Sequence, residues 1–308
     1  MKTPIVRIER LSHRYSSSWA IRDINLEISG AGITGLLGSN GAGKSTTMNI
    51  LCGVLNQTDG LVFIDGIDMR KDPEAAKKLI GFLPQTPPLY MDLTVDEYLT
   101  YSAWLRLMED RDIKDALGEA KERCGISHFS KRLIKNLSGG YRQRVGIAQV
   151  IIHRPKVVVL DEPTNGLDPN QIVEVRALIK EIAAERTVIF SSHILSEVQI
   201  LCNDIIMIDA GKIVFANTME AFTNYVEPHS ALVRMSNLPA PGELLAIGGV
   251  TRVDVLNEWQ ARVSFSGDED VTERIVEESV QKRWGLREIS LDKSSIDEIF
   301  AQLSNKSK

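Results

Sequence analysis

A glycine-rich segment between an apolar run and a helical run constrains the fold of this chain more than any other feature. The segment Gly38-Ser39-Asn40-Gly41-Ala42-Gly43-Lys44-Ser45-Thr46 follows the apolar run Ile33-Thr34-Gly35-Leu36-Leu37 and precedes the helical run Thr47 to Leu51. A strand, such a loop and a helix in this order are typical of a phosphate-binding P-loop. The alternative interpretation is a glycine-rich turn without a ligand.

Each residue type in this loop has a chemical use. Glycines let successive backbone N–H groups point inward around an anion, and the helix that follows adds its positive end. We expect Lys44 to neutralise β- and γ-phosphate oxygens and Ser45 to ligate Mg²⁺. The other predicted nucleotide contacts are Gly38, Ser39, Asn40, Gly41, Ala42, Gly43 and Thr46.

A second apolar run ends in two adjacent carboxylates. Val157-Val158-Val159-Leu160 is followed by Asp161 and Glu162, and ligands bind at the C-terminal edge of parallel strands. We expect Asp161 to hold the Mg²⁺ hydration shell and Glu162 to orient and deprotonate an attacking water. Without a neighbouring P-loop, an acidic N-cap at the end of a strand would be an equally good explanation.

The pattern of short apolar runs predicts an α/β fold with a mostly parallel core sheet. Thr187 to Phe190 and Ile205 to Ile208 are continuous rather than alternating, as in strands buried on both faces. Ile8 to Tyr15 and Leu61 to Gly66 resemble half-exposed strands of an antiparallel layer. From Thr94 to Gln149 the pattern predicts a helical subdomain, and the Thr94-x-x-Glu97 spacing fits a capping box.

The pattern restarts near Glu227, which predicts domains at residues 1–226 and 227–308. The second domain is expected to be a small α+β unit of βαββαβ, ferredoxin-like order. Val253 with Val255, and Val263 with Phe265, predict one buried sheet face. The expected elements are strands at 231–235, 251–256, 261–266 and 286–291, and helices between the first two strands, at 270–284 and at 295–303.

Composition excludes several classes of protein. The chain has 36 Lys and Arg against 41 Asp and Glu, a formal charge of −5, so it offers no overall basic field for nucleic acid. Its three cysteines lie far apart and indicate neither a zinc site nor a disulfide framework, so buried thiols are expected. Charges interrupt the amino terminus, which argues against a secretory signal. The longest apolar runs are far below the roughly 20 residues that span a bilayer.

Four further motifs identify the chain as a member of a known family. Leu137-Ser138-Gly139-Gly140-Tyr141-Arg142-Gln143-Arg144 resembles the signature of ABC transporter ATPases. Gly81-Phe82-Leu83-Pro84-Gln85 resembles their Q-loop, Asn165-Gly166-Leu167-Asp168 their D-loop, and Ser191-Ser192-His193 their switch histidine. With the P-loop and the Asp161-Glu162 pair, six motifs stand in the family's order over residues 5 to 220. Tyr141 and Ser39 depart from the Gln and Pro of many relatives.

The resemblance implies an ATPase that uses ATP and Mg²⁺. It places Gln85 and His193 with Glu162 in hydrolysis, and Gln85 with Ser45 and Asp161 at the metal. Tyr15 matches the aromatic residue that stacks on adenine, although it can instead be a strand residue that packs on the core, and Trp19 is nearby. His193 can instead be a core histidine.

The signature also implies a dimer. Ser138, Gly139 and Gly140 begin a helix and so form a second anion-binding end, too far along the fold to reach the same molecule's γ-phosphate. In the family's head-to-tail dimer each ATP lies between the P-loop of one subunit and the signature of the other, so ATP closes the dimer and hydrolysis loosens it. The implied partners are a second ATPase subunit and a transmembrane permease, and no nucleic acid.

Smaller features refine the resemblance. Gln57-Thr58-Asp59-Gly60, the stretch Leu89 to Leu99 and the tail Ser294 to Phe300 are similar to the ATPases of ABC-2-type exporters, of the drug-export or gliding-motility type. Such a subunit is expected in the cytoplasm, peripheral on the membrane through its permease. Two rival functions are an ABC ATPase of translation or DNA repair, which typically carries two cassettes or a long coiled coil, and a regulator without turnover, which would be expected to lack Glu162 or His193.

Overall fold

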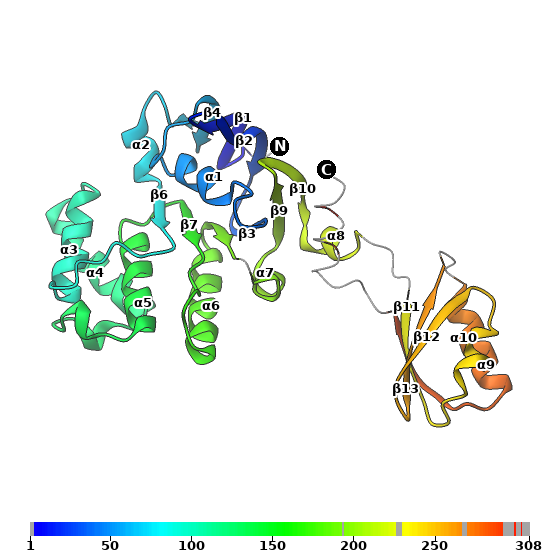
Figure 1. Cartoon of the computed structure of the whole chain (residues 1–308). Helices are drawn as coiled ribbons and strands as arrows, with labels where there is room; N and C mark the ends of the chain where they lie inside the picture. The colour runs from blue at the N-terminus through cyan, green and yellow to red at the C-terminus, as the bar shows by residue number, and fades with distance from the viewer. Residues whose placement is uncertain are drawn as a thin grey trace. The chain divides into compact units, whose positions relative to one another are not determined.

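The computed structural model describes residues 3–192, 194–225, 230–266 and 270–291, together with Ile299 and Leu303. The described residues up to Met219 form one compact unit and those from Glu220 onward form a second (Figure 1). The sequence placed this division between residues 226 and 227. The short helix α8 (Met219–Thr223) lies at the division.

The first unit is built on a six-stranded sheet in the order β10-β9-β3-β8-β7-β6. Five of its strands pair in parallel, and β10 pairs antiparallel with β9. All residues of β7 and β8 are buried, which explains why these runs are continuously apolar. The strands are β3 (Gly32–Leu37), β6 (Ile80–Leu83), β7 (Val157–Asp161), β8 (Thr187–Ser191), β9 (Asp204–Asp209) and β10 (Lys212–Thr218). The predicted α/β class with a mostly parallel core sheet is confirmed.

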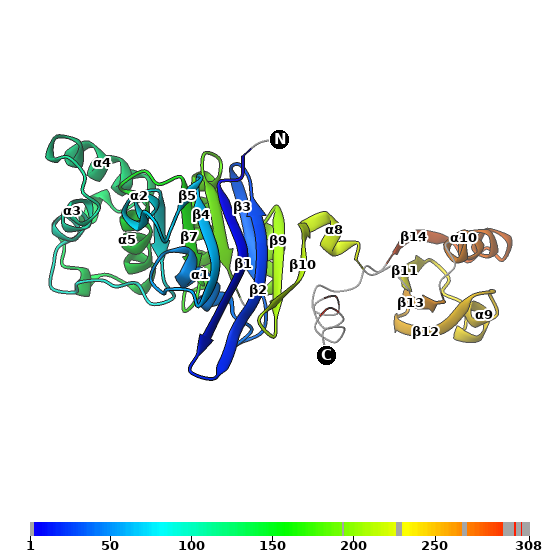
Figure 2. The same cartoon turned by 90° about the horizontal axis from the view of Figure 1, so that it is seen from above.

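A four-stranded antiparallel sheet in the order β2-β1-β4-β5 forms the second β layer (Figure 2). Its inner residues share one apolar core with the larger sheet and with helix α1 (Lys44–Leu51). In this core Ile8 and Val62 belong to the same cluster as Met48 of α1. The strands are β1 (Val6–Tyr15), β2 (Ser18–Ile28), β4 (Asp59–Ile64) and β5 (Ile67–Asp68). This arrangement fixes the P-loop helix between two sheets.

The remaining helices of the first unit follow the predicted signals. In both views the helical subdomain lies at the β6 edge of the large sheet, away from β10 (Figures 1 and 2). Thr94 and Glu97 form the expected capping box, with Thr94 N donating to Glu97 Oε2 at 2.8 Å. The subdomain consists of α3 (Val95–Leu105), α4 (Asp110–Arg123), the 3₁₀ turns η1 (Ser127–Phe129) and η2 (Ile134–Asn136), and α5 (Gly139–Ile151).

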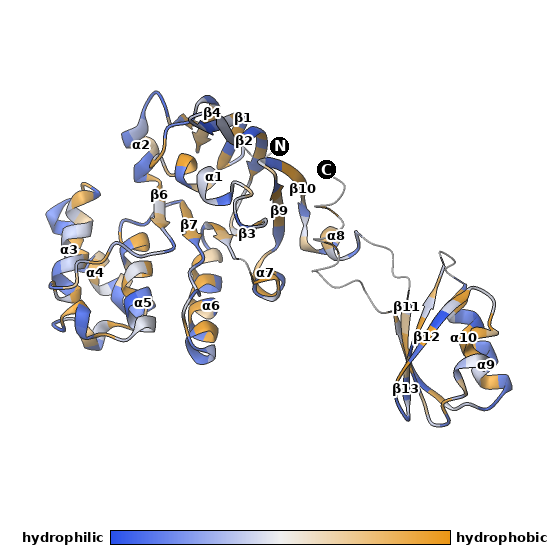
Figure 3. Ribbon diagram, in the orientation of Figure 1, coloured by the Kyte–Doolittle hydropathy of each residue, from blue (hydrophilic) through white to orange (hydrophobic). Residues whose placement is uncertain are grey.

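Three more helices connect strands of the sheets. They are α2 (Pro73–Lys78), α6 (Pro169–Ala183) and α7 (Leu195–Leu201). Helix α6 begins at Pro169 because Asp168 caps it, accepting the N–H of Gln171 at 3.0 Å. Figure 3 shows hydrophobic and hydrophilic residues interspersed along α6, as expected for a helix with one buried face.

The second unit has the element order βαββαβ. Its sheet has the order β12-β13-β11-β14 with antiparallel pairs throughout, and its own apolar core includes Val233, Val263 and Ile275. The elements are β11 (Ser230–Met235), α9 (Pro241–Leu245), β12 (Val250–Asn257), β13 (Gln260–Phe265), α10 (Val271–Gln281) and β14 (Leu286–Leu291). The helix expected at 295–303 lies outside the described residues except for Ile299 and Leu303.

One detail of the predicted sheet face is wrong. Val263 and Phe265 are buried as expected, but Val255 is 50% exposed. Strand β12 is at the edge of the sheet, and Val255 lies near its hairpin end, opposite Ala261. The apolar core does not extend to that end of β12. Val255 therefore follows the alternating pattern but is not covered by the core.

The remaining sequence expectations concern cysteines and membrane spans. Cys52, Cys124 and Cys202 are free and buried, as expected. Burial raises the pKa of the Cys124 and Cys202 thiols to about 12, which makes them poor nucleophiles. Across the described part of the chain, no helix combines the length and the apolar character needed to cross a bilayer.

Candidate active site

The P-loop joins the C-terminal end of β3 to α1. Helix α1 begins directly at Lys44, with Gly43 as its N-cap in the left-handed conformation (φ 112°). A Cβ at Gly43 would approach Ile21 Cγ2 to 2.5 Å, and one at Gly38 would collide with the backbone oxygen of Ile208. These two positions therefore require glycine, and they hold the loop tightly against its neighbouring strands.

Lys44 lies folded back over this loop. Its Nζ donates hydrogen bonds to the backbone oxygens of Gly38 (2.8 Å) and Ser39 (3.2 Å), and the side chain is buried. Burial lowers the pKa of the Lys44 ammonium below its ordinary value, and the nearby carboxylates of Glu162 and Asp161 oppose that shift. A cation is thus held at the mouth of a loop rich in backbone donors.

The carboxylate pair at the end of β7 is anchored by the neighbouring strand β8. Ser191 Oγ donates to Asp161 Oδ1 at 2.5 Å, and the backbone N–H of Glu162 donates to Ser191 Oγ at 3.0 Å. Glu162 has a positive φ of 47°, uncommon for a residue with a side chain. Asp161 is buried, whereas Glu162 is partly exposed.

Glu162 faces the Q-loop and the D-loop. Its Oε2 accepts a hydrogen bond from Gln85 Nε2 at 3.0 Å and a longer one from Asn165 Nδ2 at 3.5 Å. These groups and the P-loop surround a cavity of about 530 Å³. The cavity is lined by Asn40, Gly41, Gly43, Lys44, Ser45, Thr46, Gln85, Glu162 and Asn165.

The structure thus brings eight of the predicted site residues to one cavity: Asn40, Gly41, Gly43, Lys44, Ser45, Thr46, Gln85 and Glu162. Asn165 was predicted only as part of a D-loop motif, and its place beside Glu162 follows from the turn after β7. Several predicted residues are not part of the lining: Tyr15, Gly38, Ser39, Ala42, Asp161, Ser138, Gly139 and Gly140. His193 lies outside the described residues.

Tyr15 and Trp19 are both exposed, on adjoining strands. Tyr15 ends β1 and meets His13 edge-on at 4.7 Å between ring centroids. Trp19 lies on β2, with the guanidinium groups of Arg14 and Arg22 at 5.8 and 5.7 Å from its ring. Tyr15, exposed to 52%, has the freer ring face of the two, because Trp19 already contacts two cations.

The signature segment starts α5 in the helical subdomain. Ser138 is the N-cap, and Ser138 and Gly139 are exposed, so the helix N-terminus is open to solvent. Tyr141 points back toward η1, where its ring lies 4.6 Å from that of Phe129 and 5.7 Å from the Arg144 guanidinium carbon. The departure from Gln at this position therefore gives the signature helix an aromatic contact with the preceding turn.

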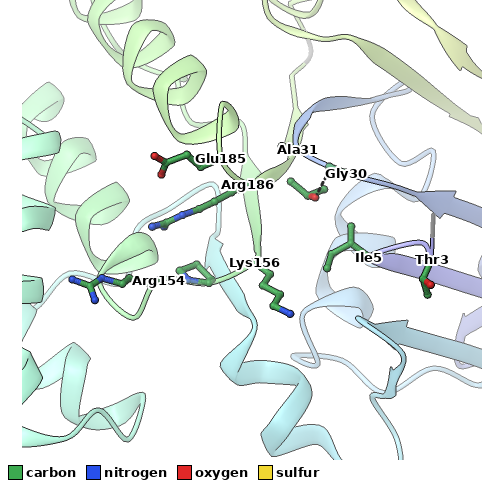
Figure 4. Close-up of a pocket in the computed structure, with 10 residues that line it drawn as sticks. Thr3, Ile5, Gly30, Ala31, Arg154, Lys156, Glu185 and Arg186 are labelled. Carbon is green, nitrogen blue, oxygen red and sulfur yellow. Dashed lines mark hydrogen bonds between the residues drawn. The ribbon is translucent and has the colours of Figure 1, made fainter.

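A different cavity, of about 590 Å³, lies at the opposite end of the parallel strands (Figure 4). Gly30, Lys156 and Arg186 precede β3, β7 and β8, whose other ends carry the P-loop, the carboxylate pair and Ser192. In Figure 4 Arg154 and Arg186 extend to one side. Arg154 is paired with Glu119, and Lys156 with Asp65. This cavity shares no lining residue with the P-loop cavity and is separate from it.

The residues at the P-loop fit a nucleotide with Mg²⁺. Mg²⁺ prefers oxygen ligands and takes few of them from the protein when phosphates supply the rest. Ser45 offers a hydroxyl in the cavity, Gln85 an amide oxygen and Asp161 one carboxylate, without sulfur or imidazole ligands in the set. This donor set and the cation at Lys44 can hold a polyphosphate and its metal.

Comparisons with known proteins agree with this geometry. The ABC transporter family model matches residues 21–165. The chain is 39% identical over 215 residues to the uncharacterized ABC transporter ATP-binding protein YdbJ of Bacillus subtilis, covering 69% of each chain. It is 37% identical to the bacitracin transport ATP-binding protein BcrA of Bacillus licheniformis, covering 68% of each. It is 35% identical to the lantibiotic transport ATP-binding protein SrtF of Streptococcus pyogenes, over 72% of this chain and 95% of SrtF.

Solved structures show the same fold. The cbiO1 subunit from Clostridium perfringens, described as part of the ABC transporter complex cbiONQ, superposes with a TM-score of 0.66 at 30% identity, over 73% of this chain and 92% of its own. A dimeric ATP-binding cassette, MJ0796, has a TM-score of 0.63 at 24% identity, over 70% and 98%, and shows the fold alone. The chain therefore belongs to the ABC transporter family, as an ATP-binding subunit with ATPase activity.

Proposed function

We propose that this chain hydrolyses Mg-ATP as one half of an ATPase dimer and thereby drives a separate membrane permease, in export. The observation that carries the proposal is the cavity in which Lys44 and Glu162 face the same space, with Gln85 bonded to the carboxylate. A cation for phosphate and a general base for water stand where one substrate can touch both.

The residues around this cavity have distinct roles in the proposal. Lys44 and the P-loop N–H groups bind and orient the phosphates, and Tyr15 stacks on the base. Glu162 accepts the proton of the attacking water, while Gln85 and His193 position the reacting groups. Mg²⁺, held by Ser45, Gln85 and Asp161, supplies charge neutralisation at the phosphates when bound.

The dimer follows from the open signature helix. The α5 end presents Ser138 and exposed backbone donors, but these residues do not line the cavity of their own chain. A second copy or a related subunit can bring its signature to the phosphates. Two composite sites then form per dimer, closed by ATP and loosened by hydrolysis.

An apolar surface suits the proposed permease. A cavity of about 500 Å³ near the Q-loop is lined by residues that include Val54, Phe82, Pro84 and Pro88. Several large apolar residues in and near the helical subdomain are exposed, and such patches mark interaction sites. They are Val54, Tyr90, Met91, Trp104, Leu105 and Leu107. Docking here would hold the subunit at the cytoplasmic face of the membrane, beside Gln85.

Export is the direction proposed because of the resemblance to ABC-2-type exporters, and two relatives are named for the transport of bacitracin and of lantibiotics. The bacitracin and lantibiotic transport proteins share the cassette with this chain at 35–37% identity. We propose that this chain powers the export of a compound that the cell makes or encounters, through a permease encoded separately. The gliding-motility type remains the second candidate on the sequence resemblance.

The C-terminal unit is proposed to be an independently folding domain that regulates the cassette. Its core is formed by residues of its own elements, β11 to β14 with α9 and α10. It contains none of the six motifs. The alternative is a passive appendage that only stabilises the chain.

The substitution Glu162→Gln tests the hydrolytic role. The amide keeps the shape and the bond to Gln85 but cannot take a proton from water, so kcat should fall by about 100-fold or more while ATP still binds. With Mg-ATP the variant should elute as a dimer in size-exclusion chromatography. Turnover near that of the wild type would contradict the assignment of Glu162.

A truncated protein ending at Val226 tests the regulatory role. It should bind ATP as the full chain does and differ in ATP-dependent dimerisation or in permease-coupled turnover. If dimerisation, coupled ATPase and transport are all equal in the two proteins, the C-terminal unit is an appendage.

A further inference from the structure

The first unit contains a fully buried carboxylate that none of the six motifs includes. Glu197, in α7, has no exposed surface. A buried carboxylate needs charge and hydrogen-bond partners, because its desolvation is otherwise costly. Glu197 has these partners on both of its oxygens, and they come from three different segments.

Each partner belongs to an element near the hydrolysis site. Glu197 Oε1 accepts from Arg176 Nη2 of α6 at 3.0 Å. Glu197 Oε2 accepts from Thr164 Oγ1 at 2.7 Å and from Ser192 Oγ at 3.0 Å. Thr164 and Ser192 are themselves almost fully buried. One carboxylate therefore joins the start of the D-loop, the end of β8 and helix α6.

The two loops held in this way flank the proposed general base and the switch residue. Thr164 follows Glu162 by two positions, and Ser192 immediately precedes His193 in the sequence. Ser192 Oγ also accepts the N–H of Ile194 at 3.0 Å, and Glu197 N donates to Ile194 O at 3.0 Å. The residues on both sides of position 193 are thus tied to α7.

Ser191, next to Ser192, links the hydrogen bonds around Glu197 to Glu162. Successive residues of a strand end point to opposite faces, and Ser191 turns toward Asp161 while Ser192 turns toward Glu197. Ser191 accepts the N–H of Glu162 through both its Oγ (3.0 Å) and its backbone oxygen (3.2 Å). Glu162 therefore lies between two anchored points, Ser191 on one side and Thr164 on the other.

We infer that Glu197 is a positioning residue for ATP hydrolysis, acting with Arg176 to hold the D-loop and the switch segment in one arrangement around Glu162. This inference rests on the proposed hydrolytic role of Glu162. Glu197 is not part of the cavity lining, so it would act without touching the nucleotide. Arg176 forms the ion pair with the buried carboxylate, and the hydroxyl donors of Thr164 and Ser192 set the positions of the loops.

The network around Glu197 should affect turnover and not nucleotide binding. Nucleotide is bound by the P-loop, which is packed against Ile21 and Ile208 and has no contact with Glu197 among the interactions described above. Small displacements of a catalytic group cost large factors in rate. Loosening the network should therefore lower kcat and leave KM for ATP nearly unchanged.

A matched pair of substitutions at Thr164 gives the sharpest test. Thr164→Val keeps the volume but removes the donor to Glu197, and Thr164→Ser keeps the donor. We expect Thr164→Val to lower kcat by about fivefold to tenfold with KM within about twofold, and Thr164→Ser to restore most of the rate. Glu197→Gln should lower kcat by at least as much. The double variant Thr164→Val with Glu197→Gln should lose less kcat than the two single losses combined predict, because both substitutions break the same network.

The control is another ion pair with a hydroxyl partner. Lys121 Nζ, in α4, bonds Asp96 at 2.5 Å and Ser130 at 2.8 Å, all within the helical subdomain. Lys121→Met should change Tm but not kcat measured well below Tm.

Two results would overturn the inference. The first is an equal kcat for Thr164→Val and Thr164→Ser while Glu162→Gln is inactive. The general base would then function without the hydrogen bond from Thr164 to Glu197. The second is a rise in KM at unchanged kcat. If Glu197→Gln does not fold, the Thr164 pair still decides. An active Glu162→Gln would instead show that the hydrolytic role of Glu162 is wrong.

Discussion

Two helices of the cassette begin with ends suited to an anion, and they differ in almost every other respect. At α1 the first residue is the buried Lys44, the cap is a left-handed glycine, and the Glu162 carboxylate lines the same cavity. At α5 the cap is the exposed Ser138, whose Oγ accepts the Tyr141 N–H at 3.5 Å. The first end is enclosed by its own chain, and the second is open.

The difference supports the proposal that one chain holds an incomplete site. In that proposal the enclosed end supplies the cation, the metal ligands and the general base, and a partner completes the site. The open end supplies backbone donors and one hydroxyl, without a carboxylate or lysine of its own at the cap. The two ends are complementary, which is what a head-to-tail dimer requires.

Mixing two inactive variants tests this complementarity, and we expect the largest change in ATPase rate from this experiment. Lys44→Ala disables the enclosed end and Ser138→Arg blocks the open end, and each alone should lose about 100-fold in ATPase rate. In an equal mixture, half of the dimers carry one intact composite site, so about a quarter of the wild-type rate should return.

The control for this mixture uses two lesions at the same end. Lys44→Ala mixed with Glu162→Gln damages the P-loop side in both chains, so no intact site can form and the rate should stay low. Equal recovery in the two mixtures, or none in the first, would contradict composite sites.

Glycine substitutions sharpen the contrast between packed and open ends. Gly43→Ala places a Cβ 2.5 Å from Ile21 and 2.9 Å from Ala20 O at a positive φ, whereas a Cβ at Gly139 meets nothing within 4 Å. We expect Gly43→Ala to cost about 2 kcal/mol or more of unfolding free energy. Gly139→Ala should gain up to about 0.5 kcal/mol, because alanine is the better helix former. Urea denaturation of both variants measures the difference, and equal stabilities would contradict it.

Acid should loosen the far end of α5. His153, just after this helix, contacts the backbone oxygen of Ile80 at 3.0 Å, and burial lowers its pKa to about 4. The neutral imidazole is favoured in the folded state, so this stability is complete above the unfolded pKa of about 6.5 and is lost as pH falls toward 4. The loss should be about 1 kcal/mol at pH 5.5. His153→Gln should flatten the change in Tm between pH 7.5 and 5.5, and an unchanged slope would exclude His153 as its cause.

The smallest effect is expected at Tyr141. Tyr141→Gln removes the edge contact with Phe129 and should cost about 1 kcal/mol of unfolding free energy. Tyr141→Phe keeps the ring and should stay within about 0.5 kcal/mol of the wild type. If the two variants are equally stable in thermal unfolding, the aromatic contact does not hold the signature helix.

The site can be predicted from the sequence most closely where backbone geometry restricts the residue type. Gly43 and Gly38 can be recognised because no side chain fits there, and the run at β7 because both faces of that strand are buried. Asp161 and Glu162 could be placed at a sheet edge from the strand alone. The predicted burial of Val255 was wrong because an alternating pattern does not indicate where the apolar core ends.

Contacts between distant segments could not be predicted. Nothing local to Glu197 indicates that it lies under Thr164 and Ser192, since those contacts depend on how α7 docks against two loops. The bond from Gln85 to Glu162 likewise joins segments 77 positions apart. The motifs gave the identities of these groups, and the packing of the sheet supplies their proximity.

The left-handed backbone at Glu162 has a consequence for protein engineering. A residue with a side chain at φ 47° stores strain, of order 1 kcal/mol, which Gly or Asn would relieve. Selection for thermal tolerance alone should therefore enrich Gly or Asn at position 162, and every variant enriched in this way would lack the carboxylate that we propose as the general base. A library screened for survival on heating must be screened again for turnover, because at this position the two traits oppose each other.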